Sequence, residues 1–558
     1  MEKRTLLAFI LSFLVLIGWS IIFPPAQQKS PVKEEKRTAQ KAASTKTKAH
    51  EKGPATFPES QWSASEKRRE AFPSPEAREK EIFIETPLYK SIFTNAGPTV
   101  KSFKLKKYRE EVDPQSPRVE LIQSGDGRNH FLKTGFSVSG SRGGHDILYQ
   151  VDKEVIKLGP HSSPEDLTFR SVTPEGIYIE QTFRFYPDRY QIDHRITVVN
   201  RSGNPIQGAF ETNLTAMPPT TKKGYYSFVG LALLKDDKLE QVKIKKQSDK
   251  KQMTGEIGWM AYETGYFITA VIPQKPVKAV FEGQMLSSGM LRGTYLSPTV
   301  SLGPSEHASS RYLLFFGPRD LHILKDVGKK LDKVVNFGWF DIIAKPLLGL
   351  LRFFNKYIHN YGVSIIVLTI LIKILFWPLT HKSYKSMKEM QKLQPRLAKI
   401  REKYKDNREQ MNKEMMALYR TYKVNPMGGC LPMVIQIPVF FALYRLLGSA
   451  IELRHAPFML WINDLSAPDR LFNFPFHVPL MAPPYGIPVL TLLMGASMYI
   501  QQKMTPSPGD PTQAKVMMFL PIIFTFLFIN FPSGLVLYWL VNNILSIGQQ
   551  YRIQKSVR

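Results

Sequence analysis

Cysteine is nearly absent from the sequence: Cys430 is the only one among 558 residues. An intramolecular disulfide is therefore impossible. The histidines lack i, i+4 spacing and no Cys-x-x-Cys pair exists, so the usual signatures of a metal site are missing. A phosphate-binding glycine loop and a nucleophile elbow are missing too. These absences argue against an enzyme, and we expect no catalytic residue, no metal and no cofactor.

Acidic residues are scarce relative to basic ones, with 47 Asp and Glu against 75 Lys and Arg and a formal net charge of +28. Such an excess fits either nucleic-acid binding or a membrane protein whose basic loops face the cytoplasm and anionic headgroups. Apolar residues are concentrated at the extreme N-terminus and after about residue 361. We therefore expect contact with a phospholipid membrane and no direct nucleic-acid specificity.

The N-terminus carries an apolar run that follows Lys3 and Arg4. The run is longer than the apolar part of a typical signal peptide, and Phe23-Pro24-Pro25 is a poor cleavage site. We interpret residues 1–23 as a retained transmembrane anchor with a cytoplasmic N-terminus, and a cleaved signal peptide is the alternative. Residues 24–80 have too few large apolar side chains to fold and predict a disordered linker.

Residues 81–335 have the pattern of an all-β domain. Residues 177–186 and 190–199 alternate apolar and polar side chains, the period of half-buried strands. Pro187-Asp188 between them indicates a turn. Many such short runs without intervening helices predict an antiparallel β-sandwich. Because this domain follows the first span, we place it outside the cytoplasm.

An amphipathic helix in the outer membrane interface is predicted next, at residues 336–358. A short buried helix of the sandwich domain is the alternative. Five transmembrane helices are then predicted at residues 361–379, 427–448, 487–503, 514–531 and 533–550. The apolar cores of the last three rise only about 21 Å, against a hydrocarbon core of about 30 Å. They predict a thinned bilayer, unless their polar flanks lie at the interfaces and the helices are longer.

A cytoplasmic helical hairpin is predicted at residues 380–426. Apolar residues recur there at three- and four-residue steps in two runs, which Asp406-Asn407 separates. An excess of lysine and arginine places the hairpin in the cytoplasm. Residues 449–486 are not basic and form a loop on the outer side, whereas the basic tail, residues 551–558, returns to the cytoplasm.

Lys373 is the unusual residue, because it lies inside an otherwise apolar span. A cation at membrane depth costs about 2.5–3.5 kcal/mol on insertion scales and usually faces a cavity or a partner. Thr369 lies one turn earlier on the same helix face. Other spans supply polar residues that could complete a cavity: Gln436, Asn530, Ser533, Asn542 and Asn543.

Two alternatives without a substrate site remain open for these side chains. Lys373 could reach the cytoplasmic headgroups by snorkelling, and the other polar residues could simply join helices. No acidic residue lies deep in the five predicted spans to neutralise Lys373. That absence favours a cavity whose acidic partner arrives from elsewhere, such as a substrate tail. Tyr538-Trp539 could form an apolar slide for a passing helix or could pack on a neighbour.

Several stretches, in their order along the chain, resemble the YidC family of membrane protein insertases, which mitochondria and chloroplasts share. They include Lys423-Val-Asn-Pro-Met-Gly-Gly-Cys-Leu-Pro432, Gln436-Ile-Pro-Val-Phe-Phe-Ala-Leu-Tyr444 and Phe531-Pro-Ser-Gly-Leu-Val-Leu-Tyr538. The resemblance implies a five-helix core around a hydrophilic groove that is open to lipid and cytoplasm. It also implies a periplasmic domain with the supersandwich fold of sugar mutarotases, although fold alone does not transfer their activity.

The resemblance places Lys373 where the family usually has an arginine that attracts acidic substrate residues. Lysine keeps the charge but loses the planar, bidentate fork. Ile437 stands for a usual methionine and Trp539 for a usual tyrosine. With the polar residues singled out above, the resemblance implies a groove of Thr369, Lys373, Gln436, Ile437, Phe440, Tyr538 and Trp539.

The function implied is insertion and folding of bacterial inner-membrane proteins, alone or with the Sec translocon. Further implied partners are nascent membrane proteins and, through the hairpin and tail, the ribosome and the signal recognition particle receptor. Two alternatives remain. A secondary transporter predicts inverted repeats and intramembrane carboxylates, and neither is found. A membrane-anchored carbohydrate-active protein predicts a paired-carboxylate or His/Glu site in the sandwich.

Overall fold

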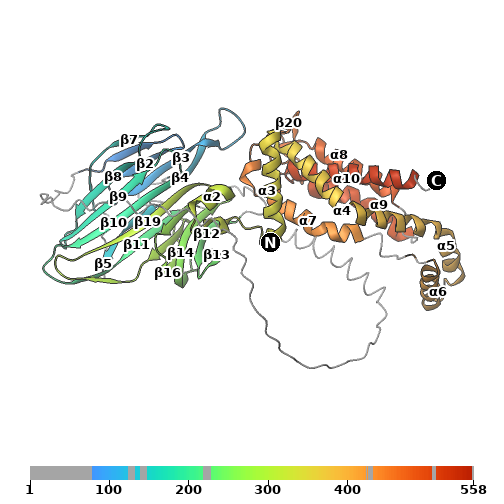
Figure 1. Cartoon of the computed structure of the whole chain (residues 1–558), viewed down its shortest axis with the longest axis horizontal. Helices are drawn as coiled ribbons and strands as arrows, with labels where there is room; N and C mark the ends of the chain where they lie inside the picture. The colour runs from blue at the N-terminus through green and yellow to red at the C-terminus, as the bar shows by residue number, and fades with distance from the viewer. Residues whose placement is uncertain are drawn as a thin grey trace, which may run out of the picture. The chain divides into compact units, whose positions relative to one another are not determined.

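A computed structural model describes residues 78–123, 132–138, 147–217, 228–422, 424, 431–505 and 511–555. The predicted N-terminal anchor, nearly all of the predicted linker and the last three residues of the predicted tail lie outside the described residues, and so does Cys430. The described chain begins with strands and continues with helices (Figure 1).

The strands of the first part fall where the alternating pattern predicts them. Their bounds are β1 (Glu81–Glu85), β2 (Tyr89–Thr94), β3 (Thr99–Arg109), β4 (Arg118–Gln123), β5 (Leu132–Val138), β6 (Gln150–Val151), β7 (Val155–Lys157), β8 (Glu165–Val172), β9 (Ile177–Phe185), β10 (Gln191–Asn200), β11 (Ile206–Ala216), β12 (Val229–Lys235), β13 (Lys238–Val242), β14 (Lys251–Thr264), β15 (Phe267–Pro273), β16 (Val277–Met285), β17 (Leu291–Leu296), β18 (Val300–Leu302) and β19 (His307–Pro318).

Nearly all strand pairs are antiparallel, and they build the two layers of a sandwich (Figure 1). One layer contains the run β8–β9–β10–β19–β15, and the other contains β5–β11–β17–β16. Strand β14 joins the layers, because residues 251–257 pair with β16 and residues 260–263 pair with β15. The pair β1–β7 is parallel. The predicted antiparallel sandwich is therefore confirmed apart from that one short pair.

The sandwich core is rich in aromatic side chains. Phe93 packs edge-on against Phe183 and Phe185, at ring-centroid distances of 5.3 and 5.6 Å, and Trp259 and Phe281 are fully buried. Each such side chain removes a large apolar area from water. A core of this size accounts for a stable domain without a disulfide.

Glu263 of β14 is the most unusual charged group of the sandwich, because its side chain is fully buried. Burial raises the pKa of this carboxyl to about 7, although Arg319 lies 3.5 Å away and opposes the shift. The folded state then holds a proton that the unfolded state releases near its ordinary pKa. The free energy of unfolding should fall by up to about 3 kcal/mol as the pH rises from about 4.5 to about 7.

Urea unfolding of the full chain in detergent, followed by protease digestion of the sandwich at each pH, measures this trend. Glu263→Gln should flatten the pH dependence between pH 4.5 and 7, because the amide cannot ionise. Glu282, an exposed carboxylate of β16, is the matched control, and Glu282→Gln should leave the slope unchanged. An unaltered slope in Glu263→Gln would show that this carboxyl does not titrate in that range.

The helices of the second part are α2 (Leu321–Val327), α3 (Asp341–Ile358), α4 (Tyr361–Lys392), α5 (Gln394–Lys403), α6 (Arg408–Thr421), α7 (Leu431–Leu447), α8 (Val489–Met504), α9 (Pro511–Phe528) and α10 (Ser533–Lys555). Among the described residues, α4 is the one helix long and apolar enough to meet a whole-span criterion. Shorter apolar stretches occur at Gln436–Leu447 in α7 and Met517–Phe528 in α9.

Helix α4 corrects a predicted boundary. The span predicted at residues 361–379 and the first residues of the predicted hairpin, up to Lys392, form one helix of 32 residues. The rest of the run before Asp406-Asn407 is α5, which ends at Lys403, and the run after it is α6, whose first turn the Asn407 side chain caps by accepting a hydrogen bond from the Gln410 amide at 3.0 Å. The arms contact each other, with the Arg396 guanidinium 5.0 Å from the Tyr422 ring centroid.

The prediction that the last three spans are short is wrong for α10. That helix has 23 residues, which rise about 34 Å, whereas the 16 residues of α8 rise only about 24 Å. The predicted apolar core of this span ends before Gln549 and Gln550, and the predicted span of residues 533–550 leaves residues 551–555 of α10 to the tail. Gln549 and Gln550 are buried, so they continue the helix rather than end it.

Helix α3 is found where the interfacial helix is predicted, and it packs on α4 and α7. Ala344, Leu348 and Leu351 are buried on one side. Ile342 and Phe353 are exposed on another. Helix α3 thus packs on the helical bundle with one apolar face and leaves another apolar face exposed. This arrangement does not fit the alternative of a helix buried in the sandwich.

A buried ion cluster ties α3 to its neighbours. The Arg352 guanidinium lies 2.6 Å from the carboxylate of Asp320, which caps α2. It also contacts the carboxylate of Glu452 in the 3-10 turn η4 (Ile451–Leu453). All three side chains are at least four-fifths buried. One cation thus serves two carboxylates from different segments of the chain.

Candidate functional site: a polar pocket among three helices

Lys373 projects from α4 into the helical bundle, where its side chain is only 7% exposed. Its ammonium donates a hydrogen bond to the Ser546 hydroxyl of α10 at 2.6 Å. The Ser546 hydroxyl in turn donates to the backbone carbonyl of Asn542 at 2.7 Å. The ammonium therefore reaches across to a neighbouring helix inside the bundle.

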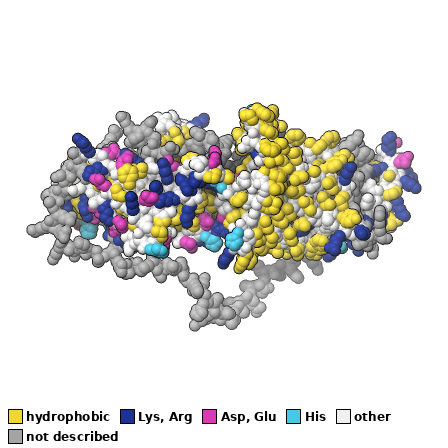
Figure 2. Space-filling view, turned by 90° about the horizontal axis from the view of Figure 1, so that it is seen from above, with side chains coloured by type: hydrophobic (Ala, Val, Ile, Leu, Met, Phe, Trp, Pro, Cys, Tyr) yellow, Lys and Arg dark blue, Asp and Glu magenta, His cyan; other side chains and the backbone are white. Residues whose placement is uncertain are grey.

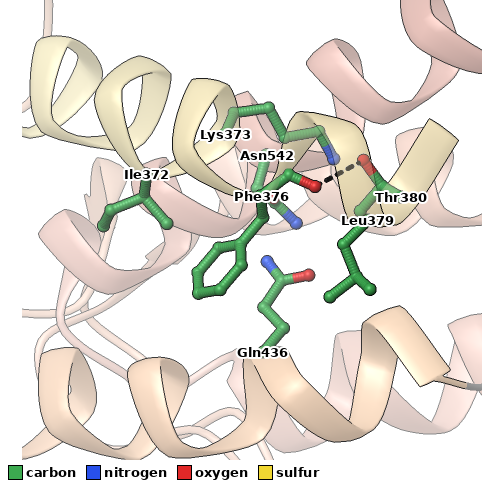
Figure 3. Close-up of a pocket in the computed structure, with 7 residues that line it drawn as sticks. All are labelled: Ile372, Lys373, Phe376, Leu379, Thr380, Gln436 and Asn542. Carbon is green, nitrogen blue, oxygen red and sulfur yellow. Dashed lines mark hydrogen bonds between the residues drawn. The ribbon is translucent and has the colours of Figure 1, made fainter.

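A small pocket opens beside Lys373, with walls from α4, α7 and α10 (Figure 3). Its polar lining comes from Lys373, Thr380, Gln436 and Asn542. Its apolar lining comes from Ile372, Phe376 and Leu379 of α4. The pocket thus offers one cation, amide and hydroxyl groups, and an apolar wall.

Hydrogen bonds hold the polar lining in place. The Thr380 hydroxyl donates to the Phe376 carbonyl at 3.0 Å and accepts from the Gln549 side-chain amide at 2.9 Å. The Gln436 amide donates to the Tyr538 hydroxyl at 3.4 Å. The polar groups of α4, α7 and α10 are therefore oriented by one another. Side chains bonded in this way are held in fixed orientations around the pocket.

An aromatic cluster is built by α7, α9 and α10. The Trp539 ring packs edge-on against Phe440 and Phe528, at ring-centroid distances of 4.6 and 5.0 Å. Phe524 lies 6.2 Å from Trp539, and Phe531 lies 4.6 Å from Phe528. The aromatic cluster adjoins the polar pocket on two helices. Gln436 and Phe440 are one turn apart on α7, and Tyr538 and Trp539 are adjacent on α10.

The structure divides the predicted groove residues into separate environments. Lys373 and Gln436 line the pocket, Tyr538 bonds to Gln436, and Phe440 and Trp539 touch each other. Thr369 is buried, and its hydroxyl donates to the Ile365 carbonyl of its own helix at 2.6 Å. Ile437 is 42% exposed. Neither Thr369 nor Ile437 is among the residues that line the pocket.

Of the five polar residues predicted to complete the cavity, only Gln436 and Asn542 line it. Asn530 instead accepts from the Ala482 amide at 2.7 Å, and Ser533 donates to the Asp464 carbonyl at 2.8 Å. Asn543 donates to the Ser497 hydroxyl of α8 at 3.0 Å. Successive helical residues point about 100° apart, which is why Asn542 and Asn543 face different neighbours.

Ser546 and Thr380 are the polar site residues that sequence reasoning missed, and Ile372, Phe376 and Leu379 are the apolar ones. Ser546 lies four residues after Asn542, and Thr380 lies seven after Lys373, so each shares a helix face with a recognised polar residue. That spacing was the available signal. The residues of α7 to α10 include no aspartate or glutamate, so the described spans give Lys373 a hydroxyl partner and no carboxylate.

Family models match both parts of the chain. The model described as "60Kd inner membrane protein" matches residues 353–558, which include the whole pocket. The model described as "YidC periplasmic domain" matches residues 81–350, which include the sandwich. The chain belongs to the YidC family. It is accordingly an inner-membrane protein, with the sandwich as the family's periplasmic domain.

Relatives of full length agree with this assignment. The "Membrane protein insertase YidC" of Syntrophus aciditrophicus is 43% identical over 560 residues, covering 100% of both chains. That of Geobacter metallireducens is 41% identical and covers 100% of this chain and 99% of its own. YidC proteins are insertases and are not known as catalytic enzymes. In the described parts of this chain, no cluster of three His, Cys, Asp or Glu side chains could hold a metal.

Solved structures with some similarity include a YidC insertase crystal structure that is 19% identical, with a TM-score of 0.37. The match covers 86% of this chain and 93% of that one. A galactose mutarotase-like protein from Lactobacillus casei is 10% identical, with a TM-score of 0.30, and covers 42% of this chain and 99% of its own. Membership of the YidC family rests on the sequence relatives and the family models.

Proposed function

We propose that this chain inserts and helps fold integral membrane proteins in the bacterial inner membrane, and that the pocket at Lys373 transiently holds the polar part of a substrate. The observation that carries the proposal is the Lys373 ammonium, which is buried among three helices and donates a hydrogen bond to the Ser546 hydroxyl. A buried cation whose partner is a neutral hydroxyl has lost its hydration without gaining a counter-charge. It should therefore bind a carboxylate more strongly than it binds the hydroxyl.

The proposed path begins on the cytoplasmic side. An acidic residue of the substrate enters the pocket and replaces Ser546 as the partner of Lys373. The hydrophobic helix of the substrate then passes Phe440 and Trp539 into lipid, where burial of its apolar surface drives the step. No nucleotide is needed. The membrane potential contributes about 2.3 kcal/mol per charge per 100 mV when an acidic tail crosses.

The pocket chemistry makes lysine a workable substitute for the usual arginine. An ammonium is a point charge with three rotatable donors, and it binds one carboxylate oxygen where a guanidinium binds two. Gln436 and Asn542 place further amide groups in the same pocket. They can supply the second contact that the missing guanidinium fork would have made.

The proposal includes a multi-pass topology. Helices α4, α7, α8, α9 and α10 cross the membrane, and the N-terminal anchor adds a sixth span. The surface supports this topology. Hydrophobic side chains cover most of the helical part, whereas Lys, Arg, Asp and Glu are scattered over the sandwich (Figure 2). Basic side chains gather again where α5 and α6 lie (Figure 2). A basic hairpin belongs in the cytoplasm, and so do both termini.

Helix α3 then lies in the outer interface of the membrane. Its buried face packs on α4 and α7, and its exposed Ile342, Phe353 and Tyr357 would rest among lipid headgroups and upper acyl chains. Nascent membrane proteins and lipid are the partners that follow from the family. The Sec translocon, and the ribosome and signal recognition particle receptor at the hairpin and tail, are proposed on the resemblance alone.

Site-specific photocrosslinking tests the path. A photoreactive amino acid at Phe440 or Trp539 should crosslink to a stalled nascent membrane protein, because both rings lie in the aromatic cluster next to the pocket. The matched control is Leu493, an exposed apolar residue of α8 on the lipid side. Crosslinks that are as strong at Leu493 as at Phe440 would mean that substrates have no preferred route through the cluster.

A further inference from the structure

The loop between α7 and α8 contains a segment without charge. Residues 471–487 include no Lys, Arg, Asp or Glu, although charged residues make up 22% of the whole chain. The segment folds into a two-stranded ribbon in which β20 (Leu471–Phe474) pairs with β21 (Tyr485–Ile487). We call residues 471–487 the outer ribbon. A loop in water usually carries charged and small polar residues, so this composition needs a reason.

The outer ribbon exposes large apolar side chains. Phe472 is 70% exposed, Phe476 is 60% exposed and Leu480 is 69% exposed. A nearby turn of the same loop exposes Met459 and Leu460. Exposed apolar residues that occur singly need no explanation, but a group of them on one loop marks a surface with an apolar partner.

Backbone conformation gives independent support. Phe472, Leu480 and Leu460 have positive φ angles of 57°, 65° and 56°. Glycine and asparagine adopt this left-handed conformation readily, whereas bulky side chains do so rarely. The chain therefore places large apolar side chains where the backbone favours small or polar ones. Strained residues of this kind are found mainly at functional sites, where the side chain has a role that offsets the strain.

The outer ribbon is fixed to the end of α9. The Asn530 side chain donates to the Leu480 carbonyl at 2.8 Å and accepts from the Ala482 amide at 2.7 Å. Arg470 donates to the Ile529 carbonyl and to the Pro484 carbonyl, both at 2.8 Å. These bonds hold the ribbon against the two residues that follow α9.

The outward face of α9 continues the apolar surface. Phe519, Ile522, Ile523 and Phe526 are each more than half exposed. In an inner-membrane protein, these side chains face acyl chains. Because the ribbon is bound to the end of this helix, its exposed apolar residues extend the same lipid-facing surface.

We propose that the outer ribbon and the turn at Met459-Leu460 insert their exposed apolar side chains into the outer leaflet of the membrane. The partner is lipid, because the ribbon continues a lipid-facing surface and offers no charge with which to recognise a protein. Aromatic side chains at this depth match the aromatic belt of membrane proteins. The proposal rests on the topology proposed above, in which this end of the bundle faces the periplasm.

Insertion of the ribbon would anchor the outer ends of α8 and α9. Helix α8 has 16 residues and is short for a bilayer. A ribbon inserted in the leaflet beside it would cover the apolar surface that this mismatch would otherwise expose to water.

The first test uses spin labels on the full chain in vesicles of phosphatidylethanolamine and phosphatidylglycerol. Single cysteines replace Phe472, Phe476 or Leu480 in a Cys430→Ser background. Phe519→Cys gives a lipid-facing control, and Ser248→Cys on the sandwich gives a water-facing one. The ribbon labels should be relaxed by oxygen and protected from a water-soluble nickel chelate, as at Phe519. Labels that behave as at Ser248, or that are shielded from both reagents by protein, would overturn the proposal.

The second test needs no labelled variant. A phospholipid with a photoreactive acyl chain should label the unmodified chain on the peptide containing residues 471–487, severalfold above the peptides of the sandwich. Phe472→Asn combined with Leu480→Asn should cut that labelling while the chain stays folded, because asparagine accepts the left-handed conformation. Absence of label on the ribbon, with label present on α9, would overturn the proposal. Lys373→Ala should leave the labelling unchanged, so this outcome is separate from the fate of the proposed insertion path.

Discussion

Lys373→Ala should lower the insertion of substrates with acidic tails about tenfold or more, which corresponds to a loss of about 1.4 kcal/mol. The ammonium is the cation that lines the pocket, and alanine leaves only amides and hydroxyls to meet a carboxylate. Charge-assisted hydrogen bonds are roughly twice as strong as neutral ones in such a site. Protease protection of a labelled substrate, in cells depleted of their own insertase, measures the effect.

Controls separate charge from volume at this position. Lys373→Arg should retain most insertion, because it keeps the cation in the same pocket. Lys373→Met should behave like Lys373→Ala, because it fills the space without charge. Substrates with neutral tails should be inserted nearly as well by all three variants. Full insertion of every acidic-tailed substrate by Lys373→Ala would rule out a role for the pocket charge.

Arg352→Ala should lower the stability of the helical part by about 3–5 kcal/mol. It removes the cation between Asp320 and Glu452 and leaves the Glu452 carboxylate buried without a counter-charge. A buried, unpaired carboxylate is far costlier than a lost surface ion pair. Thermal unfolding of the full chain in detergent should show a clear drop in the midpoint.

The matched control for that variant lies on the same helix. Lys345 pairs with Asp341 one turn away, and both side chains are about one-third exposed. Lys345→Ala should cost no more than about 1 kcal/mol, because solvent screens the pair. Arg352→Met combined with Glu452→Gln should recover part of the lost stability. If Arg352→Ala lowers the midpoint no further than Lys345→Ala, the ion cluster contributes little to stability.

The sandwich could be predicted from the sequence because its signal is local. Residues 177–185 and 191–200 alternate apolar and polar side chains, and the same residues pair as β9 and β10. The connection of the two layers through β14 could not be predicted. It depends on one long strand changing partners midway, and alternation within a strand does not name its neighbours.

The helical part shows the limits of hydropathy. The apolar core predicted for α10 ends before Gln549 and Gln550 because both are polar, yet both are buried and the helix continues to Lys555. Helix α4 was divided because its apolar run ends before the helix does. A hydropathy window finds where the apolar residues end. The helix itself ends where its backbone hydrogen bonds end, and in α4 and α10 that is several residues later.

The site was predicted in part. A cation in an apolar span is rare enough to single out Lys373 without knowledge of its neighbours. Ser546 could not be found in the same way, because it lies 173 residues away and serine is unremarkable in a helix. Thr369 was assigned to the groove from its position one turn before Lys373, but its hydroxyl bonds its own backbone instead. Periodicity gives the face of a helix and leaves open how each side chain on it is bonded.

Charge exchange between the pocket and the substrate tests the central claim most directly. Lys373→Glu should block insertion of a substrate with an acidic tail, and a substrate whose tail acids are replaced by lysine should regain insertion in that variant. Insertion efficiency for the four combinations, measured in vesicles without a membrane potential, gives the pairwise coupling between the two charges. The account predicts that the two like-charged combinations fail and the two opposite-charged ones work. Equal impairment of both substrates by Lys373→Glu would contradict it, because Lys373 would then act on the bundle and not on the substrate.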